Sequence, residues 1–180
     1  LVYLPVESPT IDEYGGNRLG ANLYAESLVA VDLKTGKYKW HFQFVHHPIW
    51  DHDMSSAPLL IDTVVAGTPR KLVAVPSKQG WLYTFDGIPG KPIWPIEERP
   101  VPQSTMHGEK TWPTQPFVTK PPAYSRTHVA EDDLIDFTPA LRAQALKNLA
   151  LFRWEPTPYV PPTGPESPDK LGSINIANWN

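Results

Sequence analysis

The sequence contains no cysteine, which excludes a disulfide framework, a thiolate metal site and covalent c-type haem attachment within this chain. It also lacks an apolar run approaching the roughly 18 residues of a membrane-spanning helix. No block of like charge stands out, and the formal net charge is -3, whereas nucleic-acid-binding surfaces gather Lys and Arg. We therefore expect no nucleic-acid partner and no membrane-spanning segment in these 180 residues.

The composition is that of a folded protein with one unusual feature, its proline content. Hydrophobic residues make up 41% and charged residues 19% of a chain with the length of one ordinary domain. Proline occurs 22 times, which disfavours long helices and favours irregular surface segments. The first residues show neither an initiator Met nor a signal-peptide pattern and read as the middle of a strand. We therefore expect the chain to be part of a longer protein.

An internal repeat organises the first half of the chain. In each copy an apolar strand runs into Asp, with Gly and then Trp following at the same spacing. The two copies, 54 positions apart, are Asp32, Gly36 and Trp40, and Asp86, Gly90 and Trp94. Asp can close a hairpin turn through its side chain, and Gly supplies the left-handed position. A four-stranded unit repeated about every 40 to 55 residues suits a propeller blade, although two such hairpins also suit any meander sheet.

Apolar runs at residues 40–44, 57–62, 71–76 and 81–85 predict strands, and residues 77–80 predict the turn between the last two. Residues 93–124 are dense in proline and aperiodic. This pattern predicts a long ordered excursion over the surface or a linker.

One helix is predicted after Thr138, which can cap it, with Pro139 at the first helical position. Acidic residues precede it, where the helix dipole favours negative charge. The apolar residues that fall on one stripe of this helix are Leu141, Ala145, Leu149 and Phe152.

The densest polar cluster is the string V-H-H-P-I-W-D-H-D at residues 45–53, directly after a predicted strand. One interpretation is a solvated loop whose His and Asp side chains bond local backbone groups. A second is a transition-metal site, although the spacing does not match a pattern such as H-E-x-x-H. A third makes one carboxylate a general base, with an aromatic wall raising its pKa by desolvation. These residues alone leave all three open.

Several motifs, in order, resemble the PQQ-dependent dehydrogenases of the membrane glucose dehydrogenase type. Residues 30–40 reproduce the A-x-D-x-x-T-G-x-x-x-W docking motif in full, and the second copy departs from it at Thr84 and Pro89. Residues 45–53 match a V-H-H-x-x-W-D-x-D loop, and residues 75–80 approximate an A-P-x-K-x-G turn. The likeness continues through residues 100–103, 113–117, 136–139 and 159–162, and so covers the chain to about residue 163.

The resemblance implies an all-β fold that forms part of an eight-bladed β-propeller. The 180 residues amount to roughly two to three blades of one domain, with blade repeats at about 24–98. A proline-rich insertion with one short helix follows at about 99–165. The remaining propeller blades are then expected partners of this chain.

The resemblance also implies oxidation of an alcohol or aldose by hydride transfer to PQQ. Asp51 would be the general base, and Lys78, at the family's separation of 27 residues, would lie near the quinone oxygens. An ordinary turn lysine is the alternative interpretation of Lys78. Trp50 and His47 are further predicted cofactor contacts, and Asp53 is expected to line the pocket or to contact Asp51, because residues two apart on a strand share one face.

The family uses Ca²⁺, and its Asn ligand corresponds here to Ser8, with Asp51 a further candidate ligand and Glu7 an alternative oxygen donor. Other implied partners are a small alcohol or sugar substrate and a quinone or cytochrome electron acceptor. The implied location is the periplasm or the periplasmic face of the inner membrane. The alternatives are a non-catalytic propeller fragment that acts as a scaffold or binding module, and a His/Asp metal hydrolase.

Overall fold

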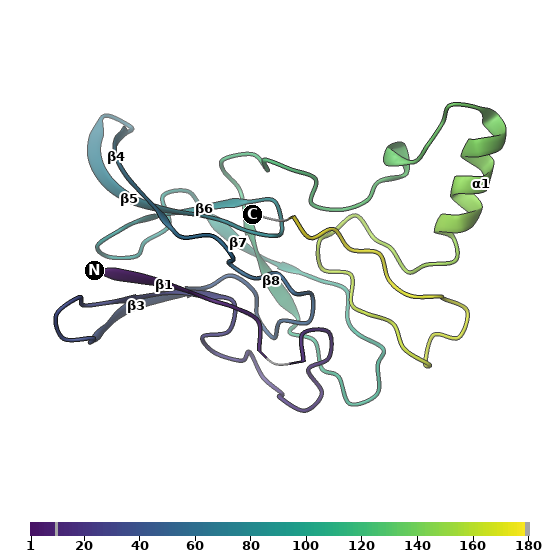
Figure 1. The fold of residues 1–180 in the computed structure, drawn as a ribbon, viewed down its shortest axis with the longest axis horizontal. Helices are drawn as coiled ribbons and strands as arrows, with labels where there is room; N and C mark the ends of the chain where they lie inside the picture. The colour runs from purple at the N-terminus through teal and green to yellow at the C-terminus, as the bar shows by residue number, and fades with distance from the viewer. Residues whose placement is uncertain (10, 179–180) are drawn as a thin grey trace.

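The computed structural model describes residues 1–9 and 11–178, which form three small antiparallel sheets, a short 3-10 helix and one α-helix (Figure 1). The first sheet has the order β1-β2-β3, the second β4-β5-β6, and the third pairs β7 with β8. The strands are β1 (Val2–Val6), β2 (Ser27–Val31), β3 (Tyr38–Gln43), β4 (Leu59–Val65), β5 (Thr68–Pro76), β6 (Leu82–Asp86), β7 (Ile96–Pro100) and β8 (Thr114–Val118). The helices are η1 (Glu131–Asp133) and α1 (Pro139–Leu149).

The two copies of the repeat form the same turn, as the sequence predicts. After β2, Gly36 N donates to Asp32 O at 2.9 Å and has φ 68°. After β6, Gly90 N donates to Asp86 O at 2.9 Å and has φ 69°. The Asp32 carboxylate also accepts from the amides of Lys34 and Thr35, which satisfies the turn locally.

Trp40 of the first copy packs on the turn of the second copy and joins the first two sheets. Its indole Nε1 donates to Gly87 O at 3.2 Å, and its ring lies so close to Gly90 that a Cβ there would meet it at 2.3 Å. Tyr3, from β1, donates to the same Gly87 oxygen at 2.8 Å. The repeat therefore encodes a contact between sheets as well as two turns.

The hydrophobic core lies between these sheets and the segment around Tyr159. Aromatic rings dominate it, with the centroids of Phe44 and Tyr83 separated by 4.5 Å. Its fully or almost fully buried members include Leu28, Ala30, Phe44, Val45, Ile49, Met54, Val73, Val75, Tyr83, Phe85, Tyr159 and Val160. The exposed apolar side chains of β4 are outside this core: Leu59, Leu60 and Val64 are 61%, 65% and 63% exposed.

The predicted strands are confirmed, but the four-stranded sheet of a complete propeller blade is not present among the described residues. Within residues 1–9 and 11–178 no sheet has more than three strands. The chain after β3 turns into a loop held by side-chain hydrogen bonds rather than pairing as a further strand.

Residues 93–124, expected to form a long ordered excursion or a linker, contain the strands β7 and β8, which pair with Glu97 opposite Phe117. These strands contain Pro100 and Pro116, and proline disfavours a strand because it cannot donate a hydrogen bond to the ladder. A two-stranded sheet tolerates them because each strand has an outward edge that needs no ladder donor.

The predicted helix is confirmed, with Thr138 as its cap and Leu141 N donating to Thr138 Oγ1 at 3.2 Å. Its apolar stripe is not a buried face, because Leu141 is 44% exposed and only Leu149 is buried. Phe152 lies beyond the last helical residue. The helix projects away from the sheets (Figure 1). No helix among the described residues is long and apolar enough to cross a membrane.

Substituting Gly90 by Ala tests the contact between the sheets. We expect a loss of about 2–4 kcal/mol in the free energy of unfolding, because the new Cβ both meets the Trp40 ring and strains a left-handed residue. Gly36→Ala is the matched control, with the same φ and nothing within 4 Å of its Cβ, and should lose only about 1 kcal/mol. Equal losses in urea denaturation of the two variants would contradict the docking of Trp40.

Candidate functional site

Lys78 lies between the two carboxylates of the polar cluster. Its Nζ is 3.2 Å from Asp51 Oδ2 and 2.9 Å from Asp53 Oδ2. The Lys78 side chain is 7% exposed, that of Asp53 16% and that of Asp51 43%. Asp51 is thus the member of the group that faces open space.

Asp51 and Asp53 meet for a different reason from the one expected. They do not lie on a strand, and Asp51 has φ 54°, in the left-handed region. Lys78 follows β5, in a turn that Gly80 completes with φ 85°. The shared ammonium group, rather than the alternation of a strand, brings the two carboxylates to one place.

Electrostatics separates the two carboxylates. Burial and the neighbouring Asp53 raise the pKa of Asp51 above its ordinary value, against the opposing effect of Lys78. Burial alone would raise the pKa of Asp53 as well, but hydrogen bonds from Asp51, Lys78 and Ser8 outweigh it and lower that pKa. For Lys78, burial favours the neutral amine, yet the two carboxylates outweigh it and raise the pKa. Asp51 is therefore the carboxylate with the greater proton affinity.

Glu26 is a fully buried carboxyl group beneath this cluster, and the sequence analysis missed it. Its Oε1 accepts from Ser8 Oγ at 2.5 Å and from His52 N at 2.9 Å, while its Oε2 has no polar partner among the described residues. Burial, with the nearby charges of Asp53 and Asp51, raises the pKa of Glu26 to about 8. No local pattern marks this residue, because its partners are 18 and 26 positions away.

An aromatic wall stands beside the carboxylates, as the general-base interpretation requires. Trp50 is 6% exposed, and its Nε1 donates to Val160 O at 2.9 Å. His52 stacks on it with centroids 6.3 Å apart and contacts Tyr159 edge-on. Burial and the Lys78 charge lower the pKa of His52 to about 3, so this imidazole is neutral.

A cavity of about 440 Å³ opens next to Asp51 and Trp50. Its other walls come from Glu13 and from the chain after Tyr159, including Thr163 and Asn175. A hydroxyl compound in this cavity would lie against the one carboxylate of the cluster that is accessible.

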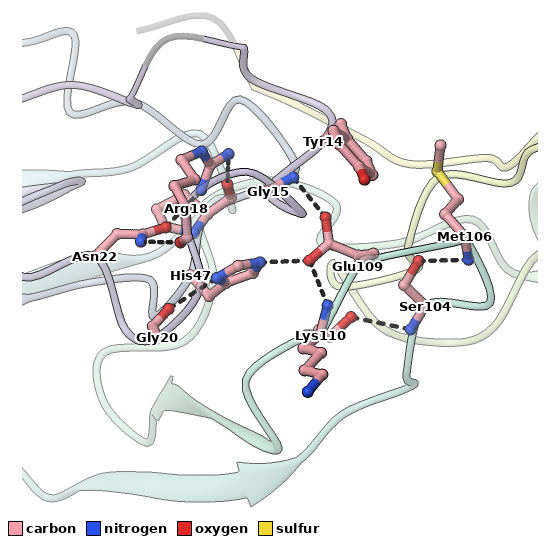
Figure 2. A network of polar contacts seen from close by, with 12 residues as sticks. Tyr14, Gly15, Arg18, Gly20, Asn22, His47, Ser104, Met106, Glu109 and Lys110 are labelled. Atoms are coloured by element: carbon pink, nitrogen blue, oxygen red, sulfur yellow. Dashed lines mark hydrogen bonds and ion pairs between the residues drawn. The ribbon is translucent and has the colours of Figure 1, made fainter.

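His47, the third predicted cofactor contact, lies apart from this cavity. Its side chain is fully buried, its Nδ1 is 2.7 Å from Gly20 O, and its Nε2 contacts Glu109 Oε1 (Figure 2). Both ring nitrogens thus have protein partners. The cofactor contact expected of His47 stays a prediction, and its visible contacts are with the protein's own loops.

Ser8, the predicted metal ligand, donates its hydroxyl to Glu26 and its amide to Asp53 Oδ1 at 2.7 Å. Asp51 contacts Lys78. Among residues 1–9 and 11–178, no three His, Cys, Asp or Glu side chains are grouped so as to hold a metal ion.

A family model described as "PQQ: Glucose/ethanol/alcohol dehydrogenase, beta-propeller domain" matches residues 1–180. The chain is 32% identical over 180 residues to a quinate/shikimate dehydrogenase (quinone) of Acinetobacter baylyi, covering 99% of this chain and 22% of that protein. It is 41% identical over 118 residues to the quinoprotein glucose dehydrogenase of Escherichia coli, covering 65% and 15%. The chain therefore spans about a fifth of the length of these curated relatives.

Among solved structures, the chain is similar to the quinohemoprotein alcohol dehydrogenase from Comamonas testosteroni. The match has 30% sequence identity and a TM-score of 0.49, and it covers 64% of this chain and 17% of that one.

The buried Glu26 predicts a specific pH dependence of stability. Between its ordinary pKa of 4.5 and its folded pKa of about 8, the folded state retains a proton that the unfolded state has lost. The free energy of unfolding should therefore fall as pH rises through this window, by up to about 1.4 kcal/mol per pH unit, and level off above it.

Glu26→Gln should remove this part of the slope, because the amide does not titrate. Urea denaturation at several pH values between about 5 and 8 measures it. Glu7→Gln, at an exposed position, is the control and should keep the wild-type slope. Identical slopes for wild type and Glu26→Gln would show that Glu26 is ionised in the folded protein.

Proposed function

Because the chain belongs to the PQQ family of glucose/ethanol/alcohol dehydrogenases, as a stretch of its β-propeller domain, we propose that it carries the proton-accepting group of a PQQ-dependent alcohol or sugar oxidation. The observation that carries the proposal is the Asp51 carboxylate, exposed to a cavity and bonded to Lys78 at 3.2 Å. The names of the relatives, which act on glucose and on quinate or shikimate, support a hydroxyl-bearing substrate.

Asp51 acts as the general base. The raised pKa of Asp51 makes its carboxylate a better proton acceptor than that of an ordinary aspartate. Asp53, with its lowered pKa, stays ionised beside it and so maintains the negative charge that raises the proton affinity of Asp51. The proton of a substrate hydroxyl in the cavity passes to the accessible Asp51 carboxylate. The Trp50 wall excludes water from one side of that carboxylate.

The residues present fit PQQ. The ammonium group of Lys78 is almost fully buried and fixed by two carboxylates, of which Asp51 lines a cavity of about 440 Å³ together with Trp50. Lys78 and Trp50 would hold the cofactor, Lys78 through its charge and Trp50 through its ring. Bound PQQ supplies a quinone that accepts hydride from the substrate carbon.

The calcium ion that the resemblance implies does not fit the donors as they stand. The Ser8 hydroxyl is directed to Glu26, and the Asp51 and Asp53 carboxylates share the Lys78 ammonium, which holds the place of a cation. The described residues offer no group of three ligands. We therefore assign the proton transfer to Asp51 and derive no step through a metal.

The remaining partners follow from the proposed activity. The missing blades of the propeller would cover exposed apolar side chains such as Leu60 and Val64 of β4. A quinone or a cytochrome would take the electrons from the cofactor. The proposed location is the periplasm or the periplasmic face of the inner membrane.

Asp51→Asn tests the proposed base in the longest native form that contains this chain. With PQQ added, dye reduction by the variant should fall by about 10²–10⁴-fold, because the amide cannot accept the proton. The stabilisation of the protein by PQQ, measured as a shift in melting temperature, should remain. Asp169→Asn, at an exposed position outside the strands, is the control and should keep the wild-type rate.

A wild-type rate of dye reduction by Asp51→Asn would refute the assignment of Asp51 as the general base. A wild-type protein that PQQ neither stabilises nor activates would support a non-catalytic scaffold instead.

A further inference from the structure

The loop that carries Asp51 has no strand pairing to hold it. It follows β3, and two of its residues, His47 and Asp51, have φ 48° and 54°. Residues other than Gly are strained in this left-handed region, so they adopt it only where the surroundings hold them there. The position of the Asp51 carboxylate therefore depends on the contacts that fix this loop.

Two segments far apart in the sequence, residues 18–21 and strand β8, supply those contacts. Gln115, fully buried on β8, clasps the His46 peptide: its Oε1 accepts from His46 N at 2.8 Å and its Nε2 donates to His46 O at 2.6 Å. Arg18 Nη2 donates to Pro48 O at 2.6 Å, and His47 N donates to Ala21 O at 2.9 Å. Backbone groups are thus satisfied at three successive positions of the loop.

A further contact of this loop joins two buried ionisable side chains, those of His47 and Glu109 (Figure 2). Their side chains are 0% and 1% exposed. The Glu109 carboxylate accepts from Gly15 N at 2.5 Å, from Lys110 N at 2.8 Å, and contacts His47 Nε2. Glu109 therefore connects the segment before β2, the loop of Asp51 and the chain between β7 and β8.

The positions of the hydrogens explain how the His47–Glu109 pair can be buried. Gly20 O can only accept, so His47 Nδ1 must carry a hydrogen. His47 Nε2 faces a carboxylate oxygen, and one proton must lie between them. Whether it belongs to His47 or to Glu109, the pair is neutral as a whole, which allows it to be buried. The pair fixes the tautomer and the plane of the imidazole four residues before Asp51.

A second His–Glu pair in the same loop provides the contrast. His46 Nε2 lies 3.0 Å from Glu98 Oε1, but the side chains are 20% and 50% exposed. Water screens this pair, and its loss leaves no buried charge behind. The buried pair of His47 can therefore fix the loop, whereas the pair of His46 is a surface contact.

We propose that Glu109 is a positioning residue for the reaction: through His47 it holds the loop that places Asp51 against the substrate. The proposal rests on the proposed role of Asp51 as base. A base must lie within hydrogen-bond reach of the proton it takes, and misplacement by about 1 Å costs as much as 10²-fold in rate.

The experiment uses the longest native form loaded with PQQ, with kcat expressed per PQQ-loaded molecule. Glu109→Ala should lower kcat by about 10–100-fold and change KM for the alcohol by less than about threefold, because the loop positions the base rather than the substrate. Glu98→Ala, the matched control, should keep kcat within about twofold. A Glu109→Ala enzyme with wild-type kcat, or an equal loss in Glu98→Ala, overturns the proposal.

Two conservative variants keep the test decisive if Glu109→Ala does not fold. The amide of Glu109→Gln can donate to neutral His47 Nε2 and accept from Gly15 N, so kcat should recover to within about threefold of wild type. Glu109→Asp keeps the charge but is one methylene too short to reach His47, and should be slower than Glu109→Gln. A fully active Glu109→Asp overturns the proposal.

A double substitution shows whether Glu109 acts through His47. His47→Asn combined with Glu109→Ala should lose no more activity than the more affected single variant, whereas the losses of two independent roles would multiply. Failure of this proposal is distinct from failure of the proposed function. If Asp51→Asn is inactive while every Glu109 variant keeps wild-type kcat, only the positioning role of Glu109 is refuted. If Asp51→Asn is active, the role of Asp51 as base is refuted.

Discussion

The packing of the Trp40 indole on the Asp86 turn is the constraint on which the site depends. Asp51 follows the last strand of the first sheet, whereas Lys78 follows the middle strand of the second. Their separation is therefore set by how the two sheets lie against each other. The indole donates to Gly87 O and fills the space that any side chain at Gly90 would occupy, which leaves the sheets one close packing.

Within that frame, a single buried cation holds two carboxylates, one nearly buried and one open to the cavity. One ammonium serves two carboxylates, and the third carboxyl group, Glu26, is kept protonated by burial and by its charged neighbours. A buried ion pair adds little net stability, since desolvation offsets much of the attraction. Its consequence here is electrostatic: burial and the neighbouring Asp53 raise the pKa of Asp51, whereas hydrogen bonds lower the pKa of Asp53, which is the difference in proton affinity that the proposed base requires.

The loop between β3 and β4 shows how a functional segment is held without a sheet. Two of its residues have left-handed backbones, and each neighbouring peptide is satisfied by a side chain or carbonyl from elsewhere. The strain is local, while the bonds that balance it come from distant parts of the chain. His47 belongs to this support, which explains why a residue in the most conspicuous polar motif lies buried away from the cavity.

The sequence by itself determined the local structure and the place of the polar cluster at residues 45–53. The Asp–Gly turns, the strands and the Thr138 cap depend on residues within a few positions of one another, so their patterns could be read directly. The W-D-x-D string located the carboxylates for the same reason. Only the tertiary structure decided which groups meet: Lys78 with Asp53 across 25 positions, His47 with Glu109 across 62, and Gly15 with Glu109 across 94. Burial of Glu26 and Glu109 also depends on sheets and loops that pack from far along the chain, and a single carboxylate in a sequence carries no mark of whether water will reach it.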